Sequence, residues 1–320
     1  MKILANDGFA ANGVSLLEEA GHEVLLNKVA QEQLADFINE NSVDVLLVRS
    51  ATKVRKELID ACPELKFIGR GGVGMDNIDV SYAREQGRRV QNTPAASSES
   101  VAELVFAHLY GGVRFLYHSN REMPLEGESN FGALKKAYAG GRELRGKTLG
   151  VMGFGRIGQA TAKIALGVGM NVVYHDPFLE KASLSLPFFD GRSLDFEFAS
   201  ISKEDLLAQS DFITLHMPAQ SDGNYVIGEK EMAKMKKGAA LVNAARGGVV
   251  SEVALLKALD DEHLSFAALD VFETEPTPPV QILMHSKLSL SPHIGAATEE
   301  AQDRIASEMA NYIIDFAKGK

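Results

Sequence analysis

The stretch from Thr148 to Asp176 constrains the fold of this chain more than any other. It begins with a short apolar run, Thr148–Met152, which leads into the glycine-rich turn GFGRIG at 153–158. A helical pattern rich in Ala, Ile and Leu follows, and a second apolar run then ends at Asp176. The order strand, turn, helix, strand and acid predicts two parallel strands joined by a crossover helix. We therefore expect an α/β protein built around this unit.

Each glycine of the turn suits the binding of a dinucleotide. Gly153 permits the tight turn, Gly155 lets a pyrophosphate approach the backbone, and Gly158 lets the helix pack on the strand. The helix N-terminus offers N–H groups to the phosphates. Asp176 lies 18 residues after the last glycine (176 − 158 = 18), near the roughly 20 expected for a carboxylate that binds the adenine ribose and repels a 2′-phosphate. This spacing predicts NAD rather than NADP; a glycine turn without a ligand is the alternative.

Length and composition predict a two-domain protein whose main partner is neither nucleic acid nor membrane. The 320 residues exceed one typical domain, and the net charge of −10 argues against nucleic acid. No apolar run approaches the ~18 residues of a transmembrane helix, and the N-terminus is too polar for a signal peptide. Cys62 is the only cysteine, so no intramolecular disulfide can form. We expect a cytoplasmic enzyme with no metal site.

Two series of alternating strands and helices are expected. The first, in residues 1–97, has about five strand–helix repeats, including the continuous apolar strand Asp44–Arg49 that a sheet buried on both faces requires. The stretch 121–142 reads as an irregular surface excursion or subunit contact, and 178–198 has no clear periodicity. The fold class predicted is α/β, with two doubly wound parallel-sheet domains. The second series is expected to have a long helix at 98–119, strands at 148–152, 172–174, 211–216, 240–243, 266–271 and 288–290, and a closing helix at 299–317.

Three residues at or after the ends of predicted strands could carry chemistry, because ligands bind at that edge of open α/β sheets. Arg246 follows an apolar run and precedes two glycines, and its planar guanidinium suits a carboxylate. His293 lies in a glycine-adjacent loop, and histidine is the natural acid–base residue near neutral pH. Glu275 could stabilise an imidazolium. The alternatives are a surface arginine, a structural histidine and a solvated acidic loop.

Eight motifs make the chain resemble the D-isomer-specific 2-hydroxyacid dehydrogenase family. They are VRSATKV at 48–54, GRGGVGMDNID at 69–79, NTP at 92–94, GKTLGVMGFGRIG at 146–158, DFITLHMP at 211–218, VNAARGGVV at 242–250, ALDVFETEP at 268–276 and SPHIGAAT at 291–298. The resemblance implies a discontinuous, flavodoxin-like substrate domain at 1–97 and 291–320, with an NAD-binding Rossmann domain inserted at 98–290. It also implies that His293 exchanges a proton with the substrate 2-oxygen, that Glu275 holds His293 and that Arg246 binds the substrate.

The resemblance further implies which residues contact the cofactor and the substrate. The expected NAD contacts are Gly153, Gly155, Arg156, Ile157, Gly158, Asp176, His216, Met217, Pro218, Ala244, Ala245, Asp270, Gly295 and Ala296. The expected substrate contacts are Arg49, Ser50, Arg70, Gly72, Val73 and Gly74, together with Arg246 and His293. Val73 and Met217 depart from the residues that relatives often carry there, so backbone contacts are expected at both.

Within the family, the resemblance is strongest to members that oxidise D-3-phosphoglycerate to 3-phosphohydroxypyruvate, the first step of serine biosynthesis. Arg49 and Arg70 would bind the phosphate; as an alternative, they only cap strands and pair with acids. Glyoxylate or hydroxypyruvate is the alternative substrate, and an NADH-sensing protein without turnover is the alternative class. The resemblance implies a homodimer built around the helix at 98–119 and the stretch after it. The end of the chain at Lys320 leads us to expect no C-terminal regulatory domain.

Overall fold

The computed structural model describes residues 1–220 and 222–319, and the chain divides into two compact units. Unit 1 consists of Met1–Ser100 and Ala296–Lys320, and unit 2 of Val101–Gly295. The sequence-based domain boundaries lie after residues 97 and 290. The assignment of a substrate domain stays a prediction.

Unit 1 is built on a five-stranded parallel sheet with the strand order β2-β1-β3-β4-β5, the flavodoxin-like order. Alternate residues of each strand enter different cores: Ile3 packs with Met309 and Ile313, whereas Leu4 packs with Leu34 and Ile38. Burial on both faces explains why β3 is apolar at every position. The elements are β1 (Lys2–Ala5), α1 (Ala11–Glu19), β2 (Glu23–Leu25), η1 (Gln31–Gln33), α2 (Leu34–Glu40), β3 (Val45–Val48), α3 (Lys56–Ala61), β4 (Phe67–Arg70), α4 (Val80–Glu85), β5 (Arg89–Asn92) and α13 (Glu299–Ala317).

Unit 2 is built on a six-stranded parallel sheet with the strand order β13-β12-β11-β10-β6-β7. After β6 the chain first builds β7 on one side and later β10 on the other, so the winding reverses between β6 and β10. Ligands bind at such a switch point in open α/β sheets. The elements are α5 (Ser98–Val113), α6 (Leu116–Glu126), α7 (Phe131–Ala137), β6 (Thr148–Met152), α8 (Arg156–Gly167), β7 (Asn171–His175), β8 (Lys181–Pro187), β9 (Ser193–Ala199), α9 (Lys203–Gln209), β10 (Phe212–Leu215), α10 (Glu229–Met232), β11 (Ala239–Asn243), α11 (Glu252–Asp260), β12 (Leu264–Leu269), α12 (Val280–Met284) and β13 (Leu288–Leu290).

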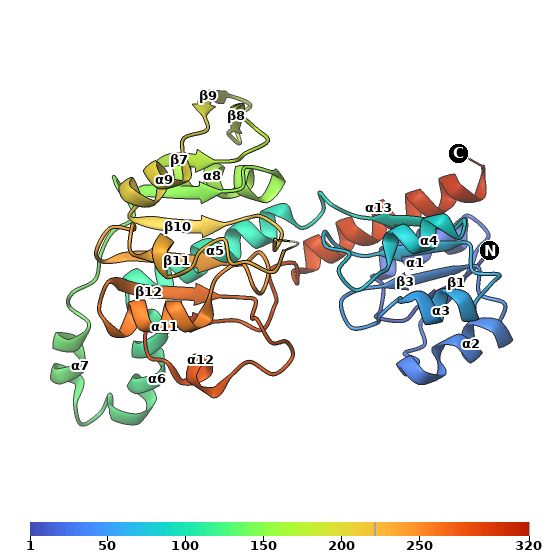
Figure 1. Ribbon diagram of the computed structural model, residues 1–320, viewed down its shortest axis with the longest axis horizontal. Coiled ribbons are helices and arrows are strands. Elements are labelled where there is room, and N and C mark those ends of the chain that lie inside the picture. Colours follow the sequence, from blue (N-terminus) through green and yellow to red (C-terminus); the bar gives the residue numbers. More distant parts are fainter. Residues whose placement is uncertain (221, 320) are drawn as a thin grey trace. The chain divides into compact units, whose positions relative to one another are not determined.

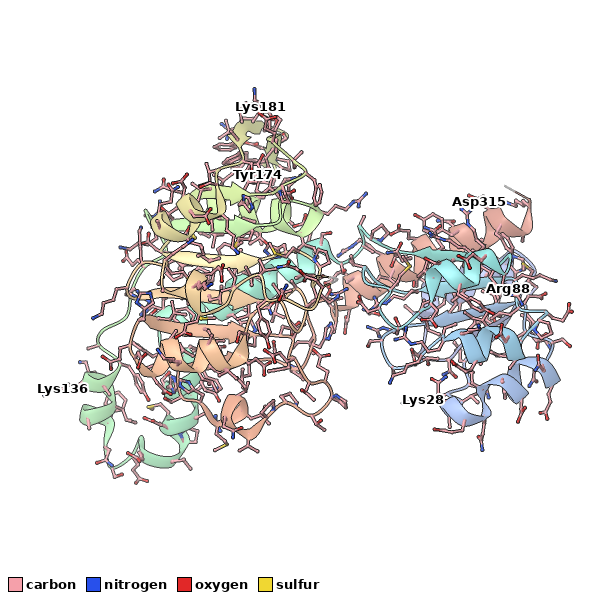
Figure 2. All side chains as sticks on the ribbon, in the orientation of Figure 1. Lys28, Arg88, Lys136, Tyr174, Lys181 and Asp315 are labelled. Carbon is pink, nitrogen blue, oxygen red and sulfur yellow. The ribbon has the colours of Figure 1, made fainter. Side chains whose placement is uncertain are left out.

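The stretch 178–198, which the sequence left unplaced, forms an antiparallel hairpin of β8 and β9 outside the main sheet. Figure 1 shows this hairpin next to β7, and Figure 2 shows Lys181 on the hairpin and Tyr174 on the edge strand. Ala182 and Leu184 of β8 are buried against the edge of unit 2. The inward-facing residues of the hairpin thus alternate with polar ones, as a half-buried strand requires.

The helix predicted at 98–119 ends earlier than expected, and the region after it is helical rather than irregular. α5 ends at Val113, and Phe115, with φ of 53°, turns the chain into α6. Gly112 allows α5 to pack closely, because a Cβ there would lie 2.2 Å from the ring of Phe266. Figure 1 shows α6 and α7 projecting from the sheet.

The described residues hold no membrane-spanning helix, and within 1–220 and 222–319 no group of three or more His, Cys, Asp or Glu is placed to hold a metal ion. Cys62 is fully buried. Burial raises the pKa of its thiol to about 11, so Cys62 is a structural residue rather than a nucleophile.

Candidate active site

The glycine turn joins β6 to α8 at the switch point of unit 2. Gly153 has φ of 85°, and a Cβ there would lie 2.5 Å from the carbonyl oxygen of His216. A Cβ on Gly158 would lie 2.2 Å from the carbonyl oxygen of Gly153. Gly155 differs, because no atom of the described residues lies within 4 Å of a Cβ built on it, and its φ of −71° suits any residue. The turn needs the first and third glycines to close, whereas the second leaves open space at the N-terminus of α8.

Asp176 is fixed against this turn from the end of β7. Its Oδ2 accepts the amide hydrogen of Phe154 at 2.8 Å, and its Oδ1 accepts that of Phe178 at 2.9 Å. Each carboxylate oxygen retains further acceptor capacity, and the residue is partly exposed. The turn therefore places N–H groups for phosphates and a carboxylate for ribose hydroxyls, which fits a dinucleotide.

The other residues predicted to contact NAD follow the carboxyl ends of the same sheet, with one exception. Arg156 and Ile157 lie in the first turn of α8. The remaining residues follow β10, β11, β12 or β13: His216, Met217, Pro218, Ala244, Ala245, Asp270 and Gly295. Ala296 falls in unit 1. Burial lowers the pKa of His216 to about 3, so this ring is neutral. Its Nε2 lies 3.0 Å from Thr214 Oγ1, and its buried Nδ1 has no partner among the described residues.

His293 and Glu275 lie together after β13 and β12. His293 Nδ1 is 2.9 Å from Glu275 Oε2, and the second oxygen of Glu275, Oε1, accepts the amide hydrogen of Phe272 at 3.0 Å. The two side chains are 42% and 36% exposed, so both remain accessible to a ligand. A carboxylate on Nδ1 fixes the ring and leaves Nε2 for a reacting group, which is the arrangement of a general acid–base residue.

The backbone of His293 has an unusual conformation that a neighbouring acid stabilises. Its φ of 55° lies in the left-handed region, which is uncommon for a residue with a Cβ. Asp270, which is 1% exposed, accepts the next two amide hydrogens: Oδ1 from Ile294 at 2.8 Å and Oδ2 from Gly295 at 2.9 Å. These bonds offset the cost of the left-handed turn.

Arg246 lies in the loop after β11, and the sequence did not reveal how this loop is held. Asn243 accepts the amide hydrogen of Ala245 at 3.1 Å and donates to the carbonyl oxygen of Arg246 at 2.9 Å. The adjacent Gly247 allows close packing, because a Cβ there would lie 1.9 Å from the carbonyl oxygen of Phe272. The Arg246 loop is thereby packed against the segment that leads to Glu275.

A pair of acids missed by the sequence analysis anchors that segment to α11. The amide of Glu273 donates to Glu252 Oε1 at 2.8 Å, and the amide of Glu252 donates to Glu273 Oε1 at the same distance. Burial, reinforced by the charge of Glu273, raises the pKa of Glu252, although the backbone hydrogen bond opposes this. These two hydrogen bonds therefore hold the loop that carries Glu273 against the start of α11. No spacing pattern in the sequence indicates this contact.

Unit 1 brings two predicted substrate residues, Arg49 and Arg70, to one glycine turn. A Cβ on Gly71 would lie 3.8 Å from Arg49 Cγ, and a Cβ on Gly72 would lie 1.7 Å from Arg70 Nη1. The guanidinium of Arg70 therefore lies across Gly72, whose φ is 135°. The side chain of Arg49 also lines a surface cavity of about 430 Å³ with Thr298. Both arginine side chains thus border this turn.

The amides of this turn are not all available to an anion. Gly72 N–H donates to Thr93 Oγ1 at 2.8 Å, so Gly72 provides conformational freedom rather than a donor. Within the described residues, the amides of Val73 and Gly74 donate no hydrogen bond. Ser50 is exposed beside Arg49, and the amide of Arg49 is held by Asp7 Oδ2 at 2.7 Å. Of the predicted substrate contacts in this turn, the amides of 73 and 74, beside Arg70, are therefore the donors left for an anion.

Comparisons with known proteins show which proteins this chain is similar to. Residues 106–295 match the profile "D-isomer specific 2-hydroxyacid dehydrogenase, NAD binding domain". The D-3-phosphoglycerate dehydrogenase of Methanocaldococcus jannaschii is 39% identical over 320 residues, 100% of this chain and 58% of that protein. The hydroxypyruvate reductase of Thermotoga maritima is 39% identical over 309 residues, 93% of this chain and 94% of that protein. The NAD+-bound structure of 3-phosphoglycerate dehydrogenase from Entamoeba histolytica has a TM-score of 0.78 and 29% identity, covering 100% of this chain and 96% of the other. This chain thus spans little more than half of the first relative and nearly all of the second.

Proposed function

The chain belongs to the D-isomer-specific 2-hydroxyacid dehydrogenase family and has NAD as its cofactor, and from this premise we propose that it oxidises D-3-phosphoglycerate to 3-phosphohydroxypyruvate. The observation that carries the choice of substrate is the pair of arginines at the glycine turn of unit 1, Arg49 and Arg70. A phosphorylated acid has a second anionic group beyond its carboxylate, and guanidinium groups bind phosphate well.

The proposed reaction uses the pair His293 and Glu275. NAD, which the turn at 153–158 and Asp176 would hold, would supply the acceptor for the hydride from substrate C2. His293 Nε2 takes the proton of the 2-hydroxyl, and Glu275, 2.9 Å from Nδ1, stabilises the resulting imidazolium. Arg246 binds the substrate carboxylate or its 2-oxygen. In the reverse direction His293 returns the proton as the 2-keto group is reduced.

The recognition of the rest of the substrate is assigned to unit 1. The amides of Val73 and Gly74 receive the carboxylate, because oriented N–H groups in a glycine-rich turn attract anions. Arg49 and Arg70, with Ser50 beside Arg49, receive the phosphate.

A second candidate is the reduction of an unphosphorylated 2-keto acid such as hydroxypyruvate. The hydroxypyruvate reductase relative, of which this chain covers 94%, supports that candidate. The two activities share the His293 chemistry and differ only in what Arg49 and Arg70 bind.

We also propose a cytoplasmic homodimer that acts in serine biosynthesis. Large apolar side chains on α6 and α7 support a subunit contact, because Leu116, Leu125 and Phe131 are 62%, 82% and 59% exposed. Light scattering should give twice the chain mass of 34.6 kDa; a monomer at micromolar concentration would contradict the dimer. Cell fractionation checks the compartment.

The substrate is tested by comparing kcat/KM for phosphohydroxypyruvate, hydroxypyruvate and glyoxylate with NADH. We expect the phosphorylated acid to be preferred, and Arg49→Ala to reduce that preference by roughly 10- to 100-fold, as the loss of a charge-assisted bond predicts. Lys53→Ala is the matched control, since Lys53 is exposed on the same loop but its backbone, not its side chain, is bonded to Gln31. An unchanged preference in Arg49→Ala and Arg70→Ala would remove the phosphate assignment.

A further inference from the structure

A chain of buried hydrogen bonds runs from α5 to the loop that carries His293. His108 Nε2 lies 2.9 Å from Ser291 Oγ, and Ser291 Oγ donates to Asp270 Oδ1 at 2.6 Å. On the other side of the ring, His108 Nδ1 lies 2.8 Å from Ser289 Oγ. His108, Ser291 and Asp270 are 6%, 8% and 1% exposed, so water hardly competes for these bonds.

The direction of each bond follows from the carboxylate at its end. The ionised Asp270 can only accept, so the hydroxyl of Ser291 donates to it and must accept from His108 Nε2–H. Burial lowers the pKa of His108, although the charge of Asp270 opposes this. The ring is therefore neutral near pH 7, and its Nδ1 accepts from Ser289. This single tautomer satisfies every member of the chain.

Asp270 is where this chain reaches the active-site loop. Its two oxygens accept the amide hydrogens of Ile294 and Gly295, the residues directly after His293. Because His293 has φ of 55°, its conformation must be imposed by its surroundings. The orientation of Asp270 thus controls the backbone that aims the imidazole at Glu275.

We propose that His108 is a positioning residue for the dehydrogenase reaction, acting through Ser291 and Asp270 on the backbone of residues 293–295. Without the donor at His108 Nε2, the hydroxyl of Ser291 can rotate away from Asp270. The hydrogen bonds that Asp270 accepts from the amides of Ile294 and Gly295 are then weakened. The catalytic consequence rests on the proposed function, but the link from His108 to the loop can be measured without turnover. A misplacement of about 1 Å can cost ~100-fold in rate, so the effect is expected in kcat rather than in KM.

The test compares His108→Leu with His108→Gln in the full chain. Gln keeps an N–H donor near the position of Nε2, whereas Leu keeps only bulk. We expect His108→Leu to speed amide exchange of Ile294 and Gly295, followed by NMR, by about tenfold or more, because the local opening becomes easier. With NADH and phosphohydroxypyruvate, kcat should fall roughly 10- to 100-fold while KM changes by less than about threefold. His108→Gln should recover most of both losses.

Two further variants separate positioning from packing. Ser291→Ala removes the middle hydroxyl without changing α5, and it must reproduce both changes even if His108→Leu does not fold; Ser291→Thr should restore them. His263→Leu is the matched control, because His263 also makes a hydrogen bond within unit 2, from Nε2 to the carbonyl oxygen of Met232 at 2.9 Å, but has no link to Asp270. It should change neither measurement.

Each outcome decides the proposal. Unchanged exchange at 294 and 295 in both His108→Leu and Ser291→Ala would overturn it, whatever the activity. Equal losses in His108→Leu and His108→Gln would also overturn it, because bulk and not the donor would then be lost. If the exchange results are as expected but the unaltered protein reduces no 2-keto acid, the positioning link stands and the proposed function fails.

Discussion

The glycines of the turn at 153–158 have different structural roles, and substitutions can distinguish these roles. A Cβ on Gly158 would lie 2.2 Å from a backbone oxygen, whereas a Cβ on Gly155 meets no atom of the described residues within 4 Å. Gly158→Ala should lower the stability of unit 2 by roughly 1–3 kcal/mol, the usual cost of overpacking. Gly155→Ala should leave the melting temperature unchanged but weaken NADH binding by about tenfold or more, because its methyl group enters the space for the pyrophosphate.

Fluorescence titration with NADH and thermal melts of both variants supply the measurements. Normal NADH affinity in Gly155→Ala would mean that the dinucleotide does not approach the turn there. A stable Gly158→Ala variant would mean that the helix can shift without cost.

At the residue scale, the sequence showed that Glu275 and His293 each follow a strand end, and the fold brings the two side chains to 2.9 Å. Their catalytic roles stay predictions. His108 could not be assigned in this way, because it lies on the buried face of α5 and its partners Ser289 and Ser291 are 181 and 183 residues away. A histidine among apolar helix positions is the sole signal, and a core residue gives the same one.

At the scale of the elements, each parallel sheet has an aspartate before one strand that accepts a backbone hydrogen bond from the neighbouring strand. Asp44 precedes β3 and accepts the amide hydrogen of Lys2 at 2.9 Å; Asp211 precedes β10 and accepts that of Thr148 at 2.8 Å. Each acid also pairs with a lysine, Lys66 at 2.7 Å and Lys236 at 3.1 Å. The two carboxylates thus fix the register of neighbouring strands.

The hydrogen bond and the ion pair of Asp211 predict a pH-dependent loss of stability. Burial alone would raise the pKa of Asp211, but the Thr148 amide, Lys236 and nearby positive charge together lower it below its ordinary value of 3.8. Its contribution is therefore fully present above about pH 4 and is lost as pH falls through the lower folded-state pKa. Asp211→Asn should cost about 1 kcal/mol at pH 6, after allowance for solvent exposure.

Denaturant unfolding of Asp211→Asn and the unaltered protein at pH 6 and at pH 3 would measure this. The gap between the two proteins should narrow at the lower pH. A gap that stays constant or widens would show that the charge of Asp211 is not what stabilises the sheet.

Element boundaries were predictable where local signals are strong. The predicted closing helix, 299–317, matches α13, because Thr298 caps its start and accepts from Ala301 N and two acids fill its first turn. The end of α5 was missed, although Gly111 and Gly112 stand just before it and weaken a helix. The hairpin of β8 and β9 was missed, although polar and apolar residues alternate along both strands.

For the whole molecule, the sequence predicted the architecture and left the details of recognition open. The repeated strand–helix pattern predicts the two parallel sheets. The glycine turn predicts the NAD site, and close backbone contacts explain why two of its positions must be glycine. The proposed substrate rests on Arg49 and Arg70, whose approach to one turn only the folded chain reveals. The proposed function rests on one chemical step, the exchange of a proton with His293 while a hydride is exchanged with NAD.

Replacing His293 by Ala tests that claim most directly. Turnover of phosphohydroxypyruvate with NADH should fall by roughly 10²- to 10⁴-fold, the usual contribution of a general acid–base residue, while NADH affinity measured on the same protein stays within about threefold, because the glycine turn and Asp176 are untouched. Turnover within tenfold of the unaltered protein, with NADH still bound, would contradict the account.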